Sequence, residues 1–122
     1  MESEVLPELN VAVVRGTCSS PAEVRILPSG SVLAQLQVTT RVDGRAVSVP
    51  VAVPDPPAWV EDLDAGDVVV VLGPVRRRFF QAGGATASRV EVEAETVARP
   101  RDRRKIAAAL RRLDASLGML GG

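Results

Sequence analysis

Hydrophobic and polar residues alternate along most of this chain with the period of two that is typical of half-buried β-strands. In residues 31–42, for example, Leu36 and Val38 fall on one face while Gln35 and Gln37 fall on the other. The pattern predicts a short extended piece at residues 23–27 and longer strands at residues 9–18, 31–42, 45–53, 67–80 and 88–100. Strands of this length and number in one small domain predict an all-β fold, a five-stranded barrel.

The breaks between these segments carry residues that favour turns. Gly30 ends a Pro-Ser-Gly turn, and the Asp43-Gly44 pair is a strong hairpin signal. Pro50 lacks a backbone donor, which predicts a sheet edge or a bulge there. The connector 54–66 is expected to hold one short helical turn that directs Trp59 and Leu63 inward, and residues 81–87 are expected to form a glycine-rich loop.

The period changes to that of a helix near the C-terminus. The apolar residues of this segment fall within about 60° on a helical wheel; they are Ile106, Leu110, Leu113 and Leu117. Its basic residues lie roughly opposite; they are Arg101, Arg104, Arg111 and Arg112. Two interpretations remain open: an amphipathic helix that docks on the barrel or on a second subunit, and a basic helix that binds nucleic acid or a membrane surface.

These boundaries predict an N-terminal lead at 1–8, a barrel domain at 9–99, a helix at 100–118 and a tail at 119–122. Pro100 and Asp102 suit the start of the helix, and Gly118 suits its end.

Composition restricts the chemistry that the chain can perform. The sequence has one cysteine, no histidine, no tyrosine and only three aromatic residues, Trp59, Phe79 and Phe80. An internal disulfide, a Cys/His metal cluster and histidine-based catalysis are therefore excluded. We expect a protein that is not an enzyme, with no catalytic residues, no metal site and no cofactor.

No stretch approaches the roughly 20 apolar residues of a membrane span. We therefore expect a cytoplasmic protein without a membrane partner.

The charges are segregated although their sum is zero. Residues 1–67 carry four basic side chains against ten acidic ones, whereas residues 68–122 carry eleven against five. Such asymmetry favours a basic surface in the second half of the chain, which suits a nucleic-acid partner. The alternative is that the charges only solvate opposite faces.

Two blocks of residues, in order, resemble the bacterial single-stranded DNA-binding protein family over about residues 9–99. The first block is Asn10, Gly16, Pro21, Glu23, Arg25, Pro28 and Gly30. The second is Gly66, Val69, Val71, Gly73, Val75, Arg76 and Arg78, and it runs to Phe80, where the family has an aromatic residue. The resemblance implies an OB-fold barrel, a single-stranded DNA partner and a homo-oligomer, a dimer or a tetramer.

The same segment offers the chemistry of a single-strand site. By alternation Arg76, Arg78 and Phe80 share one face of a strand, so guanidinium groups could meet phosphates while a ring stacks on a base. The predicted nucleic-acid contacts are Arg76, Arg77, Arg78, Phe80 and Arg89, and the helix arginines 101, 104, 111 and 112 are candidate additional contacts. RNA would suit the same chemistry, and a solubilising loop is the alternative.

The sequence also departs from the family. The long loop between strands two and three is reduced to Asp43-Gly44, strand three presents small residues instead of aromatic ones, and the acidic C-terminal tip is missing. Two functions therefore remain. One is sequence-tolerant single-stranded DNA binding in replication, repair or recombination. The other is an OB-fold module that binds a protein partner through the smooth face of strand three or the C-terminal helix.

Overall fold

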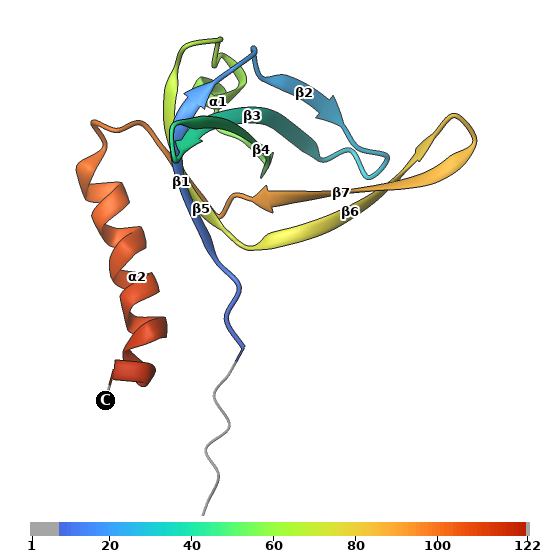
Figure 1. Cartoon of the computed structure of the whole chain (residues 1–122). Helices are drawn as coiled ribbons and strands as arrows, with labels where there is room; N and C mark the ends of the chain where they lie inside the picture. Colours follow the sequence, from blue (N-terminus) through green and yellow to red (C-terminus); the bar gives the residue numbers. More distant parts are fainter. Residues whose placement is uncertain (1–7, 122) are drawn as a thin grey trace, which may run out of the picture.

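A computed structural model describes residues 8–121 of the chain, as strands around a barrel followed by one long helix (Figure 1). The strands are β1 (Ala12–Cys18), β2 (Glu23–Ile26), β3 (Val32–Val42), β4 (Arg45–Pro54), β5 (Val68–Gly73), β6 (Val75–Ala82), β7 (Ala85–Glu93) and β8 (Thr96–Ala98). The helices are α1 (Ala58–Glu61) and α2 (Arg103–Gly121). The predicted lead at 1–8 lies outside the described residues except for its last residue.

Each predicted strand is present, and the predicted fold class is confirmed. The predicted strand 67–80 is interrupted at Pro74, and the predicted strand 88–100 is interrupted between β7 and β8. The sheet order is β6-β7-β4-β3-β1-β5-β8, with β2 paired to β3. Since β5 and β6 are two parts of one run through Pro74, this order returns on itself and closes the barrel.

Two glycines allow the backbones of neighbouring strands to approach closely, Gly73 where the barrel closes and Gly16 between β1 and β3. A Cβ atom on Gly73 would lie 1.9 Å from the backbone oxygen of Glu93, and one on Gly16 would lie 2.4 Å from that of Thr39. Neither backbone atom can move without breaking strand pairing, so only glycine fits at these positions.

The predicted turn at Asp43-Gly44 is confirmed. Both residues have positive φ, 51° and 78°, as a two-residue hairpin turn requires, and they join the paired residues Val42 and Arg45. At Pro50, β4 pairs only with β3, because its pairing with β7 is restricted to Val51 and Ala52. The expected sheet edge at Pro50 is therefore present.

The core fills the barrel with aliphatic side chains, among them Leu36, Val38, Val51, Val69 and Val71. The predicted helical turn is α1, which buries Val60 completely. Leu63 is buried beside it, and Trp59 packs against the same cluster. The connector therefore closes one end of the barrel.

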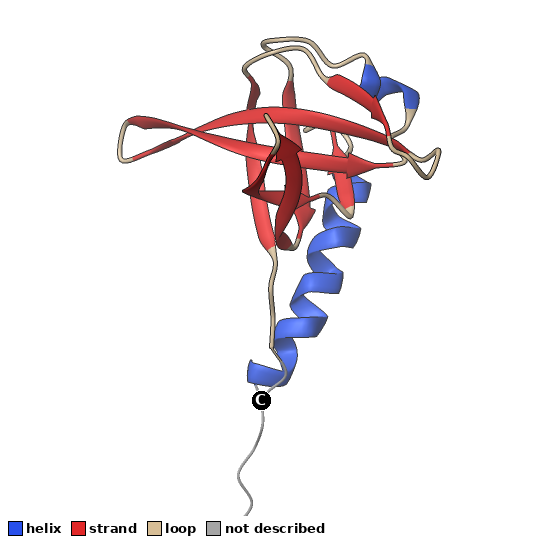
Figure 2. Ribbon diagram, turned by 90° about the vertical axis from the view of Figure 1, so that its right-hand side faces the viewer, coloured by secondary structure: helices blue, strands red, loops and turns tan. Residues whose placement is uncertain are grey.

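Helix α2 rests on the outer side of β5, where Ile106 and Ala109 pack against Val70 and Leu72. Its first turns pack against the barrel, and its later turns extend beyond the sheet (Figure 2). Only one edge of the apolar stripe is covered, since Leu110 and Leu117 remain 43% and 38% exposed.

The end of α2 corrects one prediction. The helix continues through Gly118 to Gly121. A glycine in a helix interior costs about 1 kcal/mol relative to alanine, and this cost does not stop a helix when the flanking residues are good helix formers. None of the helices in residues 8–121 is long and apolar enough to span a bilayer.

Candidate nucleic-acid interface

Strands β6 and β7 form a long hairpin, residues 75–93, which we call the hairpin arm. It extends away from the barrel on the side opposite α2 (Figure 1). The strands pair from Val75↔Val92 to Ala82↔Ala85, and Gly83 and Gly84 turn the chain with positive φ. Beyond its short contact with β4, the arm is a two-stranded ribbon that exposes both of its faces.

The register divides the arm side chains into two sets. Arg76 lies opposite Glu91, Arg78 opposite Arg89, and Phe80 opposite Ala87, so these six residues share one face. Arg77 lies opposite Val90 and Phe79 opposite Ser88, on the other face. Arg76, Arg78 and Phe80 therefore do lie together, as their alternation in the sequence suggested.

Glutamates neutralise part of the first face. Arg78 Nε lies 2.9 Å from Glu91 Oε2, and Arg76 Nε lies 3.1 Å from Glu93 Oε1. Arg89 also approaches Glu91, at 3.6 Å. Alternation in the sequence places Glu91 and Glu93 on one face of β7, but their pairing with arginines depends on the hairpin register.

Glu91 is the structural centre of this cluster. Its side chain is only 2% exposed, between Arg78 and Arg89, which face each other across the two strands. Two like charges in that position repel each other, and the carboxylate offsets the repulsion. We therefore assign Arg78 and Arg89 a structural role in holding the arm together, whatever else they bind.

The second face of the arm is less constrained. Arg77 donates from an Nη atom to the hydroxyl of Ser88 at 3.0 Å. Within residues 8–121, no carboxylate lies within 4.0 Å of the Arg77 guanidinium. Phe79 beside it is 67% exposed, more than Phe80 at 42%. Phe79 was not among the predicted contacts, although its place next to Phe80 in the sequence was a signal.

The arm keeps a positive balance, with four arginines against two glutamates. Arg76 is the most exposed of the paired arginines, with 60% of its side chain open to solvent. A surface ion pair of this kind contributes little to stability, about 0–1 kcal/mol, so Arg76 can exchange its glutamate for another anion. Arg76, Arg77 and both rings are the chemically available groups of the arm.

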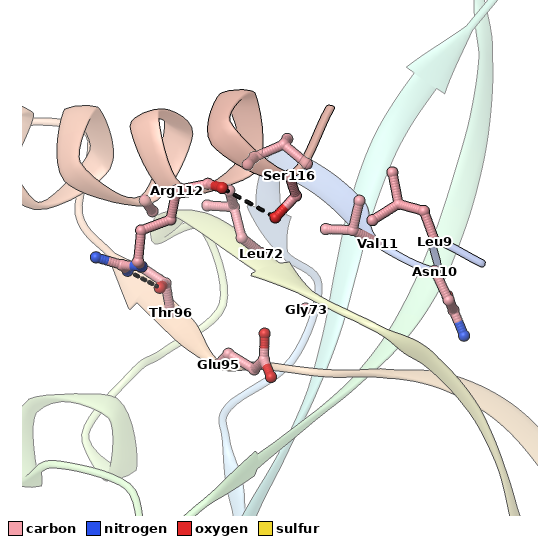
Figure 3. Close-up of a pocket in the computed structure, with 11 residues that line it drawn as sticks. Leu9, Asn10, Val11, Leu72, Gly73, Glu95, Thr96, Arg112 and Ser116 are labelled. Carbon is pink, nitrogen blue, oxygen red and sulfur yellow. Dashed lines mark hydrogen bonds between the residues drawn. The ribbon is translucent and has the colours of Figure 1, made fainter. Parts of the chain in front are cut away.

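The predicted helix arginines lie elsewhere. Helix α2 is on the other side of the barrel from the arm, so the structure does not bring the two sets together (Figure 1). Arg112 donates to the hydroxyl of Thr96 at 3.3 Å, beside a cavity of about 470 Å³ between α2 and the start of β1 (Figure 3). Arg104 and Arg111 are exposed on α2, and Arg101 is exposed just before it.

Trp59 is already engaged within the fold. The Arg99 guanidinium lies 4.6 Å from the centre of its ring, and the Lys105 ammonium lies 5.9 Å from it. This ring is therefore not a free stacking platform. Among the described residues, no group of three or more acidic or cysteine side chains is placed to hold a metal ion.

The fold and the arm together define an OB-type barrel with a basic hairpin. The chain is similar in structure to a deletion mutant (delta 228-252 R190A) of the single-stranded DNA binding protein from Thermus aquaticus, with a TM-score of 0.63 and 22% sequence identity. The match covers 75% of this chain and 41% of that chain, so this chain corresponds to less than half of that protein. No family model matches the sequence, and no curated protein does.

Proposed function

We propose that this protein binds single-stranded DNA through the hairpin arm, with little sequence preference. The observation that carries the proposal is the combination of exposed rings and guanidinium groups on both faces of a projecting ribbon. Rings stack on any base, at about 1–3 kcal/mol per base, and arginines meet phosphates, so neither contact reads a sequence. Replication, repair and recombination are the processes in which such binding would serve.

The departures from the family limit the expected strength of this interaction. The outer face of β4 carries small side chains, so Phe79 and Phe80 must supply the stacking. Glu91 and Glu93 lower the positive potential at the arm. We therefore expect weaker and more salt-sensitive binding than a full set of aromatic residues would give.

The test is fluorescence anisotropy of a labelled oligo-dT strand at about 50 and 200 mM salt. Arg77→Ala should reduce the slope of log affinity against log salt by about 0.7, the value for one phosphate contact on a single strand. Phe79→Ala and Phe80→Ala should weaken binding and leave the slope unchanged. Arg45→Ala, at the far end of the β3–β4 hairpin, is the matched control for a lost charge.

Absence of binding by the unaltered protein at the lower salt concentration would exclude this function. An oligo-U strand in the same assay compares RNA with DNA. If only deletion of the helix arginines weakens binding, the arm is the wrong site.

A homo-oligomer is a further part of the proposal. Exposed apolar side chains lie on both elements that border the cavity between α2 and β1. Leu9 and Val11 line the cavity itself, and Val13 on β1 and Leu110 and Leu117 on α2 are exposed as well. Burying them between copies of the chain would remove apolar surface from water. Light scattering after size exclusion should give a dimer or a tetramer at micromolar concentration, and a monomer would contradict this. Capture of another protein by this face would favour the protein-interaction function.

A further inference from the structure

A second positively charged site lies away from the hairpin arm, where β1 meets β3. It is a pocket of about 540 Å³, lined by two arginines, Arg15 and Arg41, and by the hydroxyl side chains of Thr17, Ser19, Thr39 and Thr40. No aspartate or glutamate lines it within the part of the chain that the structure describes. This composition differs from that of the arm, where glutamates partner most of the arginines.

The strand register explains why both arginines reach the pocket. β1 pairs with β3 only at Thr17↔Thr39 and Cys18↔Val38. Continuing this register by two residues would place Arg15 opposite Arg41, although the ladder itself stops before that point. Arg15 and Arg41 therefore lie on the same face of β1 and β3, just past the end of the ladder, and both line the pocket.

The backbones of β1 and β3 remain in close contact beside the pocket. Gly16, next to Arg15, meets the backbone of Thr39 so closely that no side chain would fit between them. The Arg41 guanidinium lies at the turn side of the pocket, where one of its Nη atoms donates to the backbone oxygen of Gly44 at 3.2 Å. The nearby Asp67 is directed into its own turn, where its carboxylate accepts from the backbone N–H of Asp64.

Two guanidinium groups that line one pocket repel each other, and an anion between them offsets this repulsion. Within residues 8–121, no carboxylate is within 4.0 Å of either guanidinium. Guanidinium groups and hydroxyls are also the usual protein donors to phosphate oxygens. The pocket therefore has the charge, the donors and the volume for one phosphate group.

The pocket shares a face of the sheet with the arginines of the arm. Ala52 on β4 pairs with Glu93 on β7, so the outer face of β4 continues into the face that carries Arg76 and Arg78. Ser48 on β4 pairs with Thr39 on β3, and Thr39 pairs with Thr17 on β1, so the same face of the sheet extends from β4 to β1. Neighbouring strands are about 4.8 Å apart, so β7 and β1 are separated by roughly 14 Å across the sheet.

The geometry points to the Arg15–Arg41 pocket as a second anchor for single-stranded DNA, which binds a backbone phosphate of a strand that also contacts the hairpin arm. This inference rests on the proposed function. On this face β4 carries only small side chains, of which Ala46 and Ser48 are exposed, Pro50 is half-buried and Ala52 is buried. The pocket supplies part of the electrostatic attraction that the paired arginines of the arm have lost.

The experiment compares Arg15→Ala/Arg41→Ala with Arg45→Ala in the oligo-dT assay. Arg45 is at the same end of the hairpin as Arg41 but pairs with Val42 on the opposite face. The double variant should bind a strand of about 24 nucleotides roughly tenfold more weakly at about 50 mM salt, with the salt slope reduced by about 0.7, the value for one phosphate. Arg45→Ala should bind like the unaltered protein.

The backbone amide signals of Thr17 and Thr39 provide a second measurement. Oligo-dT should shift them in the unaltered protein and not in the double variant. If the double variant binds DNA normally while the arm variants do not, this inference is overturned and the proposed function stands. If inorganic phosphate shifts these signals and oligo-dT does not, the pocket binds a free anion and the inference is also overturned. If neither the unaltered protein nor any variant binds DNA, this inference and the proposed function are both overturned.

Discussion

Arg78 donates through Nε to the carboxylate of Glu91 at 2.9 Å, in a pair whose acidic partner is almost completely buried while the arginine is one-third exposed. The contact joins β6 to β7 beyond the last residues that pair with β4. A nucleic-acid contact of Arg78 therefore competes with an interaction that stabilises the arm itself.

Replacing Glu91 with glutamine should destabilise the protein by roughly 1–3 kcal/mol, because Arg78 and Arg89 would face each other without a carboxylate between them. Urea denaturation followed by circular dichroism measures the change. Glu93→Gln is the matched control, since its side chain is 28% exposed and its pairs should contribute less than about 1 kcal/mol. Equal losses for the two variants would show that burial of Glu91 has no special role.

Glu93→Gln should strengthen the binding of oligo-dT by about two- to fivefold at about 50 mM salt, because it removes a negative charge that lies beside Arg76 and Arg78. The gain should shrink at about 200 mM salt. Glu61→Gln, on α1, changes the net charge equally and should leave the affinity unchanged. Equal gains from both variants would assign the effect to net charge and not to the arm.

Gly73→Ala should cost about 3 kcal/mol or more, because the new methyl group would overlap the backbone oxygen of Glu93 where the barrel closes. Thermal and chemical denaturation both report this loss. Gly118→Ala is the contrasting variant. A Cβ there meets no atom within 4 Å, and alanine should stabilise α2 by up to about 1 kcal/mol. A mild effect at Gly73 would mean that the barrel can open there.

Burial raises the pKa of the Cys18 thiol, and the negative charge of Asp67 adds to the rise. A thiol reagent should therefore modify Cys18 far more slowly in the folded protein than in urea. Because the folded-state pKa lies above the unfolded one, the associated stability is complete below the unfolded pKa of about 8.5 and decreases as pH rises beyond it. Cys18→Ala should lose this alkaline decrease, and rapid labelling of the folded protein would contradict the assignment.

The barrel could be predicted because its strands alternate and its turns carry specific residues. Asp43-Gly44 determines both the turn and the register of β3 with β4, so the sequence was sufficient there. The arm was harder. Residues 81–87 were expected to form a loop, but the strands continue to Ala82 and Ala85, and only this register places Glu91 opposite Arg76.

Helix α2 shows a different limit of prediction from the sequence. Its apolar stripe indicated that α2 packs against something, but periodicity cannot determine which edge of the stripe is covered. Ile106 and Ala109 meet the barrel, while Leu110 and Leu117 do not. The pocket at Arg15 and Arg41 was also hidden, because those residues are 26 positions apart and come together only through the pairing of β1 with β3.

The ion pairs of the hairpin arm have a mechanical consequence. A two-stranded ribbon without a third strand is only marginally stable, and its cross-strand pairs contribute about 0.2–1 kcal/mol each to its stability. Raising the salt concentration screens the contacts to phosphates and, at the same time, weakens the exposed ion pair between Arg76 and Glu93. The arm should therefore bend more freely in the salt range that releases DNA, and a plot of log affinity against log salt should steepen as salt increases instead of remaining linear.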